Sequence, residues 1–145
     1  MNISRTGMAY KHLFLDSDVL LDWLLKSEPF ASYTQTVINE STRQNFKVST
    51  STLVIANINY ILSKRTTVSN ARQNINRLVN LINILPFEAD IIISALDSTF
   101  VDFEDSIQHQ IALKYNCEVI ITRNIKDYKH SNIPVLTAEQ FLRTL

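Results

Sequence analysis

Short apolar runs alternate along the chain with longer segments in which apolar residues recur every three or four positions. The run His12–Leu15 stops abruptly at Asp16, and apolar residues from Val19 to Leu24 then recur at helical spacing. Short apolar runs bounded by polar residues are typical of strands, and the three-to-four spacing is typical of amphipathic helices. This part of the chain therefore predicts a strand, a cap and a helix.

The same alternation continues to the end of the chain. Further strands are predicted over 46–49, 84–85, 118–122 and 133–136, and further helices over 31–45, 53–63, 68–81, 88–96 and 103–115. Thr137 to Gln140 has the pattern of a capping box that opens a last helix. Strands that alternate with helices favour a parallel sheet covered on both faces, so the predicted fold class is α/β, a three-layer α/β/α sandwich with a mainly parallel central sheet.

The composition is that of one globular domain. The chain has 145 residues, 46% hydrophobic and 19% charged, which is enough to bury a core without disulfides. No apolar run reaches the roughly 18 residues needed to span a bilayer, and the first residues do not resemble a secretory signal. We expect a soluble cytoplasmic protein without membrane contact, with a poorly ordered extension over residues 1–10 and one domain over 11–145.

Cysteine usage and charge narrow the possible chemistry. Cys117 is the only cysteine, which excludes an internal disulfide, and its place before an apolar run predicts a buried thiol. The 14 basic residues balance 14 acidic ones, so the global charge gives no sign of a nucleic-acid binder. One segment nevertheless holds Arg123, Lys126, Lys129 and His130, which is either a local RNA-binding patch or a solvated surface loop.

Polar residues follow the first and the fourth predicted strands. Asp16 ends the first strand and Asp18 lies two residues later, whereas Thr122 and Asn124 end the fourth strand and Asp127 follows. In parallel sheets the ligand crevice lies beyond the carboxyl ends of the strands, so these residues are the first site candidates. For Asp18 we favour the alternative role of helix cap, whereas Asp16 precedes the cap position.

A second acidic group opens the helix predicted over 103–115. Asp102, Glu104 and Asp105 fall within four positions. Acidic residues in a first turn interact favourably with the helix dipole and cap free amides, but three carboxylates exceed what capping needs. If this helix start faces the strand ends, Asp105 joins Asp16 around a hard cation, Mg²⁺ or Mn²⁺, which prefers oxygen ligands.

Two further features each have two interpretations. Asn57 lies on the apolar face of its predicted helix, so its amide is either a hydrogen-bonded core group or lines a polar site beneath that helix. The apolar segments around Trp23 and Ile91–Ile93 offer either core packing or a dimer surface, and we favour core packing for both.

The segment Leu13–Leu24 contains the sequence Leu-Asp-Ser-Asp-Val-Leu-Leu and resembles the opening motif of PIN domains. In that motif asparagine usually occupies the position at which this chain has Asp18. The segments that resemble the later acidic helix, strand and closing region of that fold are 102–108, 117–124, 126–128 and 133–142. Because these segments keep their order and spacing, the resemblance covers nearly the whole chain from about Lys11.

The resemblance implies a metal-dependent ribonuclease of the VapC toxin type, in which acidic residues bind Mg²⁺ or Mn²⁺. By position, Asp16 and Asp105 match family carboxylates, and Asp127 and Asp18 would assist through metal-bound waters. The expected chemistry is hydrolysis of RNA phosphodiester bonds by a metal-activated water.

The residues after the fourth strand would then contact the substrate. Arg123 and Lys126 would hold phosphates that flank the scissile bond by charge, and Thr122 would hold them by hydrogen bonding. The implied partners are an RNA substrate, an antitoxin protein that covers the site and a second copy of the chain.

Two positions depart from the family pattern. Asn57 stands where the family usually has glutamate, and Asn124 stands where many members have aspartate, so both would line the site without adding negative charge. These departures leave a second hypothesis, a PIN-like module that binds RNA or a protein partner without cutting. An unrelated domain for a small phosphorylated ligand is disfavoured, because the single glycine, Gly7, cannot build a phosphate-binding loop.

Overall fold

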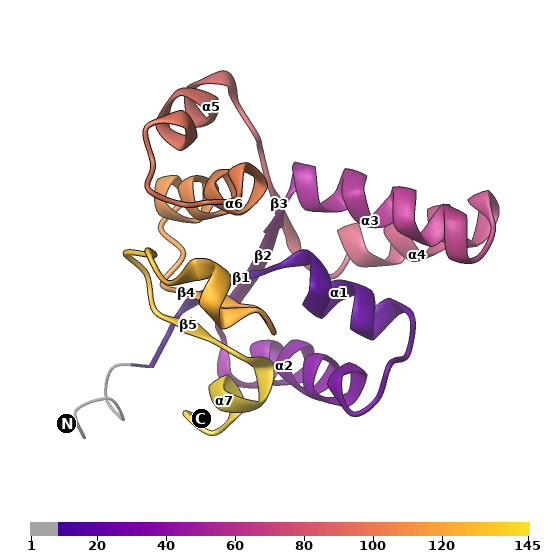
Figure 1. Cartoon of the computed structure of the whole chain (residues 1–145). Helices are drawn as coiled ribbons and strands as arrows, with labels where there is room; N and C mark the ends of the chain where they lie inside the picture. Colours follow the sequence, from indigo (N-terminus) through magenta and orange to yellow (C-terminus); the bar gives the residue numbers. More distant parts are fainter. Residues whose placement is uncertain (1–8) are drawn as a thin grey trace.

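The computed structural model describes residues 9–145 of the chain. The extension predicted over residues 1–10 falls mostly on residues 1–8, which lie outside the described residues. Figure 1 shows a central sheet with helices on both sides. Its strands are β1 (His12–Leu15), β2 (Lys47–Ser51), β3 (Asn83–Leu85), β4 (Val119–Ile121) and β5 (Val135–Leu136). They follow the order β3-β2-β1-β4-β5, and every pairing is parallel.

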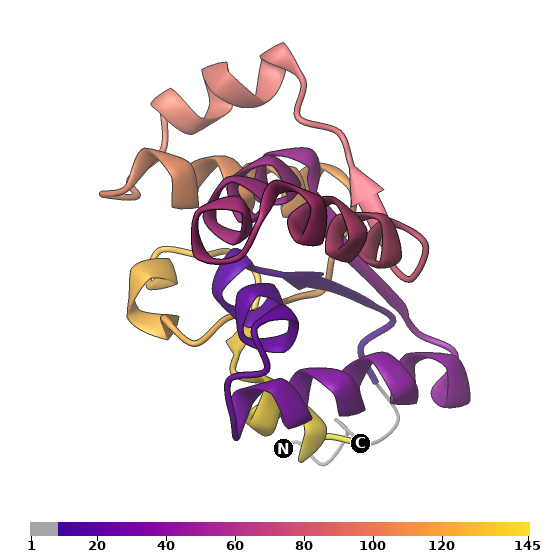
Figure 2. The same ribbon diagram turned by 90° about the vertical axis from the view of Figure 1, so that its right-hand side faces the viewer.

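The helices cover both faces of this sheet. They are α1 (Ser17–Leu24), α2 (Phe30–Gln44), α3 (Thr52–Arg65), α4 (Val68–Val79), α5 (Ala89–Leu96), α6 (Phe103–Lys114) and α7 (Ala138–Leu142), with a short 3₁₀ helix, η2 (Ile125–Tyr128). In both ribbon views α5 and α6 lie together on one side of the sheet, and α2 and α7 lie on the other (Figures 1 and 2). The predicted α/β/α sandwich with a parallel sheet is confirmed.

The two central strands are apolar because they are covered on both faces. Every residue of β4 and the last three residues of β1 are fully buried. Such continuous apolar runs are expected for the inner strands of a parallel sheet. The position of β1 between β2 and β4 therefore places Asp16, which follows it, near the centre of the sheet edge.

The neighbouring strand β2 ends in buried hydroxyl groups that have hydrogen-bond partners. Thr50 donates a 2.7 Å hydrogen bond to the backbone carbonyl of Leu15, and the Ser51 hydroxyl donates a 2.6 Å bond to the side chain of Gln108 in α6. Ser51 also caps α3 by accepting from the backbone N–H of Val54. These bonds tie the carboxyl end of the sheet to the helices that surround it.

The helix starts largely agree with the sequence signals. The capping box predicted over Thr137 to Gln140 is present at the start of α7, and Cys117 is buried as predicted. The 3₁₀ helix η2 was not predicted, because four residues are too few to show a periodic apolar pattern. Within residues 9–145, no helix is long and apolar enough to span a membrane.

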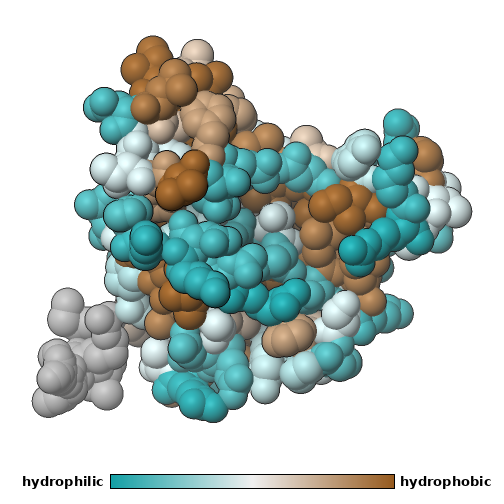
Figure 3. Space-filling view, in the orientation of Figure 1, coloured by the Kyte–Doolittle hydropathy of each residue, from teal (hydrophilic) through white to brown (hydrophobic). Residues whose placement is uncertain are grey.

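The prediction of core packing for Ile91–Ile93 is wrong for two of the three residues. Ile91 is 3% exposed and packs inward with Ala95, but Ile92 and Ile93 are 41% and 72% exposed. Helix α5 packs mainly against α6, so only one stripe of its surface is covered. Figure 3 shows the resulting hydrophobic patch at the top of the molecule, over α5.

Candidate functional site

The carboxylate of Asp16 lies where β1 ends and α1 begins. Its side chain is buried, with 7% exposed, and Oδ1 accepts a 2.8 Å hydrogen bond from the backbone N–H of Ser17. Oδ2 accepts a 3.0 Å hydrogen bond from the Thr122 hydroxyl, just after β4. The strand register explains this contact, because Leu15 pairs with Ile121 and brings the residues after both strands together.

Asp18 has a different role from the predicted one. It is not the helix cap, because α1 already begins at Ser17 and its N-cap is Asp16. From the first turn of α1, the Asp18 carboxylate reaches the segment that follows β4. There Oδ2 accepts hydrogen bonds from the backbone N–H of Arg123 at 3.0 Å and from the side-chain amide of Asn124 at 3.2 Å.

The Thr122 hydroxyl lies between these two carboxylates. It is fully buried, 3.0 Å from Asp16 Oδ2 and 3.3 Å from Asp18 Oδ2, and it accepts a 3.1 Å bond from the backbone N–H of Asn124. A hydroxyl has one proton, so Thr122 can donate to only one of the two carboxylates at a time. The negative charge at the ends of β1 and β4 is therefore only partly compensated.

The acidic start of α6 separates into three roles. Asp102 is the N-cap and accepts a 2.9 Å hydrogen bond from the backbone N–H of Asp105. Glu104 accepts a 2.8 Å bond from the side-chain amide of Asn57 in α3. Within residues 9–145, the Asp105 carboxylate itself accepts no hydrogen bond. Capping thus accounts for one of the three carboxylates, and Asp105 is free to bind a ligand.

The pKa values of Asp16 and Asp105 indicate that the start of α6 lies within electrostatic range of the strand ends. Burial and then the charge of Asp18 raise the pKa of Asp16 to about 6. Burial raises the pKa of Asp105 to about 7, with further contributions from the negative charges of Asp102, Asp16 and Asp127. Like charges shift pKa values in this way only over short distances. The carboxylates of Asp16 after β1, Asp105 in α6 and Asp127 in η2 therefore lie close enough to interact electrostatically.

A buried tyrosine lies beside this acidic group. Tyr128 is 2% exposed, and its hydroxyl makes no hydrogen bond of normal geometry with any residue in 9–145, although it interacts with the nearby Asp16 carboxylate. Burial raises the pKa of Tyr128 far above its ordinary value, and the negative charges of Asp16 and Asp105 raise it further. Tyr128 cannot be recognised as a site residue from the sequence, because a single aromatic residue after Asp127 looks like an ordinary core residue.

Basic residues surround the mouth of the acidic site. A cavity of about 260 Å³ is lined by Val101, Asp102, Asp105, Lys126, Asp127, Lys129 and His130. Within the described part of the chain, neither lysine of this cavity takes part in an ion pair. Lys126, Lys129 and His130 thus adjoin the carboxylates, and the RNA-binding role of this basic segment stays a prediction.

Arg123 is already engaged within the protein. Its guanidinium forms two hydrogen bonds with the buried carboxylate of Asp22, at 2.7 Å and 3.1 Å. It also lies over the ring of Phe30, with 4.4 Å from the guanidinium carbon to the ring centroid. The phosphate-binding role of Arg123 stays a prediction, and Lys126 and Lys129 are the cations with free charge at the rim.

The carboxylates suit a hydrated cation better than a closed ligand cage. Among residues 9–145, no three His, Cys, Asp or Glu side chains converge closely enough to form a ready set of metal ligands. Mg²⁺ usually keeps several waters and binds proteins through one or two carboxylates, so a complete cage is not required. Burial is the main cause of the raised pKa values of Asp16 and Asp105, and the neighbouring carboxylates add to it; a hard divalent cation would relieve this second contribution.

Together, the parallel sheet and this acidic group define an α/β domain with a candidate site at the carboxyl ends of the central strands. The sequence profile of the PIN domain matches residues 12–126. This chain therefore belongs to the PIN domain family, which confirms the resemblance found in the sequence.

Similar proteins cover nearly the full length of the chain. Ribonuclease VapC1 of Aquifex aeolicus (strain VF5) is 30% identical over 139 residues, which are 92% of this chain and 95% of that protein. DNA-bound VapBC from Salmonella typhimurium matches with a TM-score of 0.70 at 14% identity, over 88% of this chain and 98% of that one. VapBC-1 from nontypeable Haemophilus influenzae matches with a TM-score of 0.68 at 18% identity, over 88% and 98%. At these identities the two structures confirm the fold alone.

Proposed function

We propose that this chain is a divalent-metal-dependent ribonuclease and the toxin of a toxin–antitoxin pair. One observation carries the proposal: the carboxylates of Asp16, Asp18, Asp105 and Asp127 gather around the ends of β1 and β4, beside a lysine-containing rim. The 30% identity to a protein named as a ribonuclease supports it.

In this mechanism Asp16 and Asp105 would be the principal ligands of Mg²⁺ or Mn²⁺, and Asp127 and Asp18 would assist through water molecules. The bound cation would polarise the scissile phosphate and lower the pKa of a water that attacks it in line. Thr122 keeps the Asp16 carboxylate in place through its 3.0 Å hydrogen bond. Lys126 and Lys129 attract the RNA phosphates that flank the cut.

The partners follow from the same comparison. Two of the similar solved structures are VapBC assemblies, which supports an antitoxin that covers the site of this chain. The exposed face of α5, with Ile92, Ile93 and Leu96, supports a second copy as a further partner, because apolar patches of this kind mark protein interfaces.

The test is cleavage of a pool of structured and single-stranded RNA by the purified chain with Mn²⁺, Mg²⁺ or EDTA. We expect metal-dependent cutting that falls roughly 100-fold or more in Asp16→Asn and in Asp105→Asn. Asp97→Asn is the matched control, because Asp97 is an exposed carboxylate at the end of α5. Cutting that persists in both site variants would refute the proposal.

A second candidate is a module that binds RNA without cutting it. Its support is that Asn57 and Asn124 place neutral amides at two positions of the site, where the Asn124 amide already donates to Asp18. An amide contributes no negative charge to cation binding. RNA retained in a gel shift, without cleavage at any metal concentration, would favour this module over the enzyme.

A further inference from the structure

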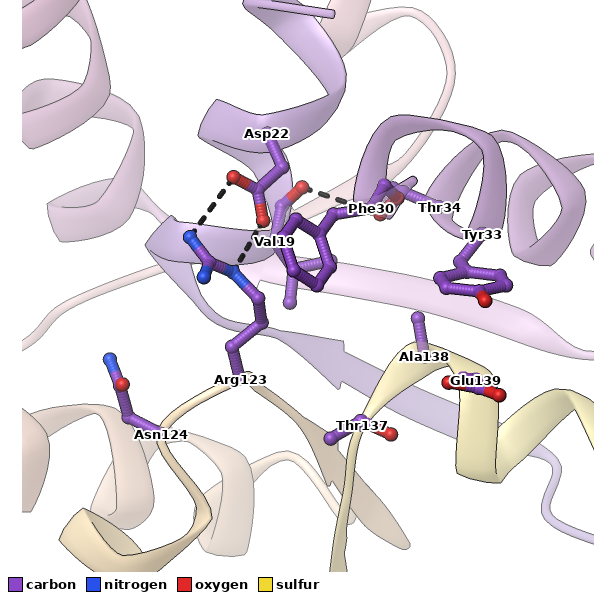
Figure 4. Close-up of a pocket in the computed structure, with 10 residues that line it drawn as sticks. All are labelled: Val19, Asp22, Phe30, Tyr33, Thr34, Arg123, Asn124, Thr137, Ala138 and Glu139. Atoms are coloured by element: carbon purple, nitrogen blue, oxygen red, sulfur yellow. Dashed lines mark hydrogen bonds and ion pairs between the residues drawn. The ribbon is translucent and has the colours of Figure 1, made fainter. Parts of the chain in front are cut away.

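A second cavity, of about 300 Å³, adjoins the acidic site. Its walls come from α1, α2, the segment after β4 and the start of α7, as Figure 4 shows. The residues that it shares with the acidic site are Arg123 and Asn124, whose N–H groups both donate to Asp18. A ligand that fills this cavity would therefore lie next to the proposed cleavage site.

The walls of this cavity offer aromatic faces, and its charged groups are paired within the protein, Asp22 with Arg123 and Glu139 with Arg143. Phe30 and Tyr33 project from α2, and the guanidinium of Arg123 is held over the Phe30 ring. Because Asp22 pairs with that guanidinium through two hydrogen bonds, its positive charge is already neutralised. Phosphate is thus a poor occupant, whereas a planar and uncharged group can stack on such surfaces.

Polar groups with spare hydrogen-bonding capacity line the same space. The Tyr33 hydroxyl makes no hydrogen bond with any residue in 9–145. The side-chain amide of Asn124 donates to Asp18 through Nδ2. The side-chain oxygen Oδ1 of Asn124 accepts no hydrogen bond within the described residues. The cavity therefore combines aromatic faces with a free hydroxyl and a free acceptor, which is the combination that recognises the edge of an unstacked base.

We propose that this cavity binds one unpaired nucleobase of the RNA, next to the scissile phosphate, and so selects where the chain cuts. The inference rests on the proposed ribonuclease function. RNA would then run from the rim of Lys126 and Lys129, across the carboxylates, to Phe30 and Tyr33. Single-stranded or looped RNA is the substrate class, because a paired base cannot leave its helix without losing its stacking and pairing.

The test uses the Asp16→Asn chain with Mn²⁺, which should bind RNA without cutting it. A set of short single-stranded RNAs is prepared in which one nucleotide at a time lacks its base, and the affinity of each is measured by fluorescence anisotropy. We expect one abasic position to weaken binding roughly tenfold, the usual effect of one lost stacking contact.

Cavity variants identify the site of that contact. In Phe30→Ala, added to Asp16→Asn, we expect the intact RNA to bind as weakly as the abasic one, so the abasic position no longer matters. Tyr33→Phe removes a single hydroxyl with little risk to folding and should change which base is preferred at that position. Tyr60→Ala, at an exposed aromatic residue of α3 outside the cavity, is the matched control and should leave the abasic profile unchanged.

The outcomes separate this inference from the function on which it rests. If the wild-type chain cuts RNA but no abasic position weakens binding, the cavity proposal is wrong and the ribonuclease stands. The same conclusion follows if the abasic effect persists unchanged in Phe30→Ala and the preferred base is unchanged in Tyr33→Phe. If the chain neither binds nor cuts RNA, both proposals fail.

Discussion

The side-chain amide of Asn57, in α3, donates a 2.8 Å hydrogen bond to the carboxylate of Glu104, in the first turn of α6. The sequence left open whether Asn57 is a core residue or lines a polar site, and the structure shows it half-buried against an acidic residue. By resemblance, position 57 is where PIN domains usually have glutamate. The bond thus brings a carboxylate from another helix to the place where this chain lacks one.

If Glu104 supplies that missing charge, Glu104→Gln should weaken Mn²⁺ binding about tenfold, as expected for a group next to the direct ligands. Asn57→Ala should have a similar effect, because Glu104 would lose the contact that orients it. The double variant should then be no weaker than either single one. Isothermal titration calorimetry with Mn²⁺ measures the dissociation constants of the three variants. Constants equal to that of the wild-type chain would exclude this role for Glu104.

The carboxylates of Asp16 and Asp105 should lower the stability of the metal-free protein as the pH rises from about 4 to 7. The pKa values of Asp16 and Asp105 are raised from 3.8 to about 6 and about 7, so the folded state holds their protons more tightly than the unfolded state. That contribution is complete below pH 4 and is lost as the pH passes through the folded values. Urea unfolding in EDTA at pH 5 and pH 8 measures it.

The site variants provide the comparison for this pH dependence. Asp16→Asn and Asp105→Asn should each be more stable than the wild-type chain at pH 8, and the difference should shrink at pH 5. Asparagine keeps the N-cap of α1, so Asp16→Asn removes charge without removing the cap. Equal pH profiles for the wild-type chain and both variants would show that these carboxylates carry no unfavourable charge.

The buried hydroxyl of Tyr128 should matter for cleavage and not for folding. Because this hydroxyl makes no hydrogen bond of normal geometry among residues 9–145, Tyr128→Phe should leave the free energy of unfolding within about 1 kcal/mol of the wild-type value. Cleavage should fall about tenfold, since the hydroxyl lies beside Asp16 and Asp105 and can donate to a water or phosphate bound there. Thermal melts test the expected stability, and initial cleavage rates test the expected loss of activity. Full activity of Tyr128→Phe would contradict the catalytic role of the hydroxyl.

The pair of Asp22 and Arg123 should contribute to stability because one partner is buried. Asp22 is almost fully buried, whereas Arg123 is partly exposed. Arg123→Ala leaves a buried carboxylate without a partner, and we expect a loss of about 1–3 kcal/mol in the free energy of unfolding. Adding Asp22→Ala should recover part of that loss, since it removes the uncompensated charge. A double variant less stable than Arg123→Ala would contradict this account.

The order of the elements was already determined by the sequence alone. The strands β1 and β4 are short apolar runs because both of their faces are covered, and the helices show their own apolar periodicity. Local capping signals located the start of α7, where Thr137 and Gln140 form the predicted box. Asp16 and Asp105 were selected as candidates because strand ends and an excess of acids over caps are both visible in sequence.

Only the tertiary structure decided what each polar residue does. Asp16 and Thr122 are 106 positions apart, and Asn57 and Glu104 are 47 positions apart, so no local pattern could pair them. Chain folding also made Asp16, and not Asp18, the cap of α1, because the cap is the residue before the first helical one, and α1 begins at Ser17. Apolar periodicity arises from burial along one element, whereas a site arises from side chains of several elements that meet at a sheet edge.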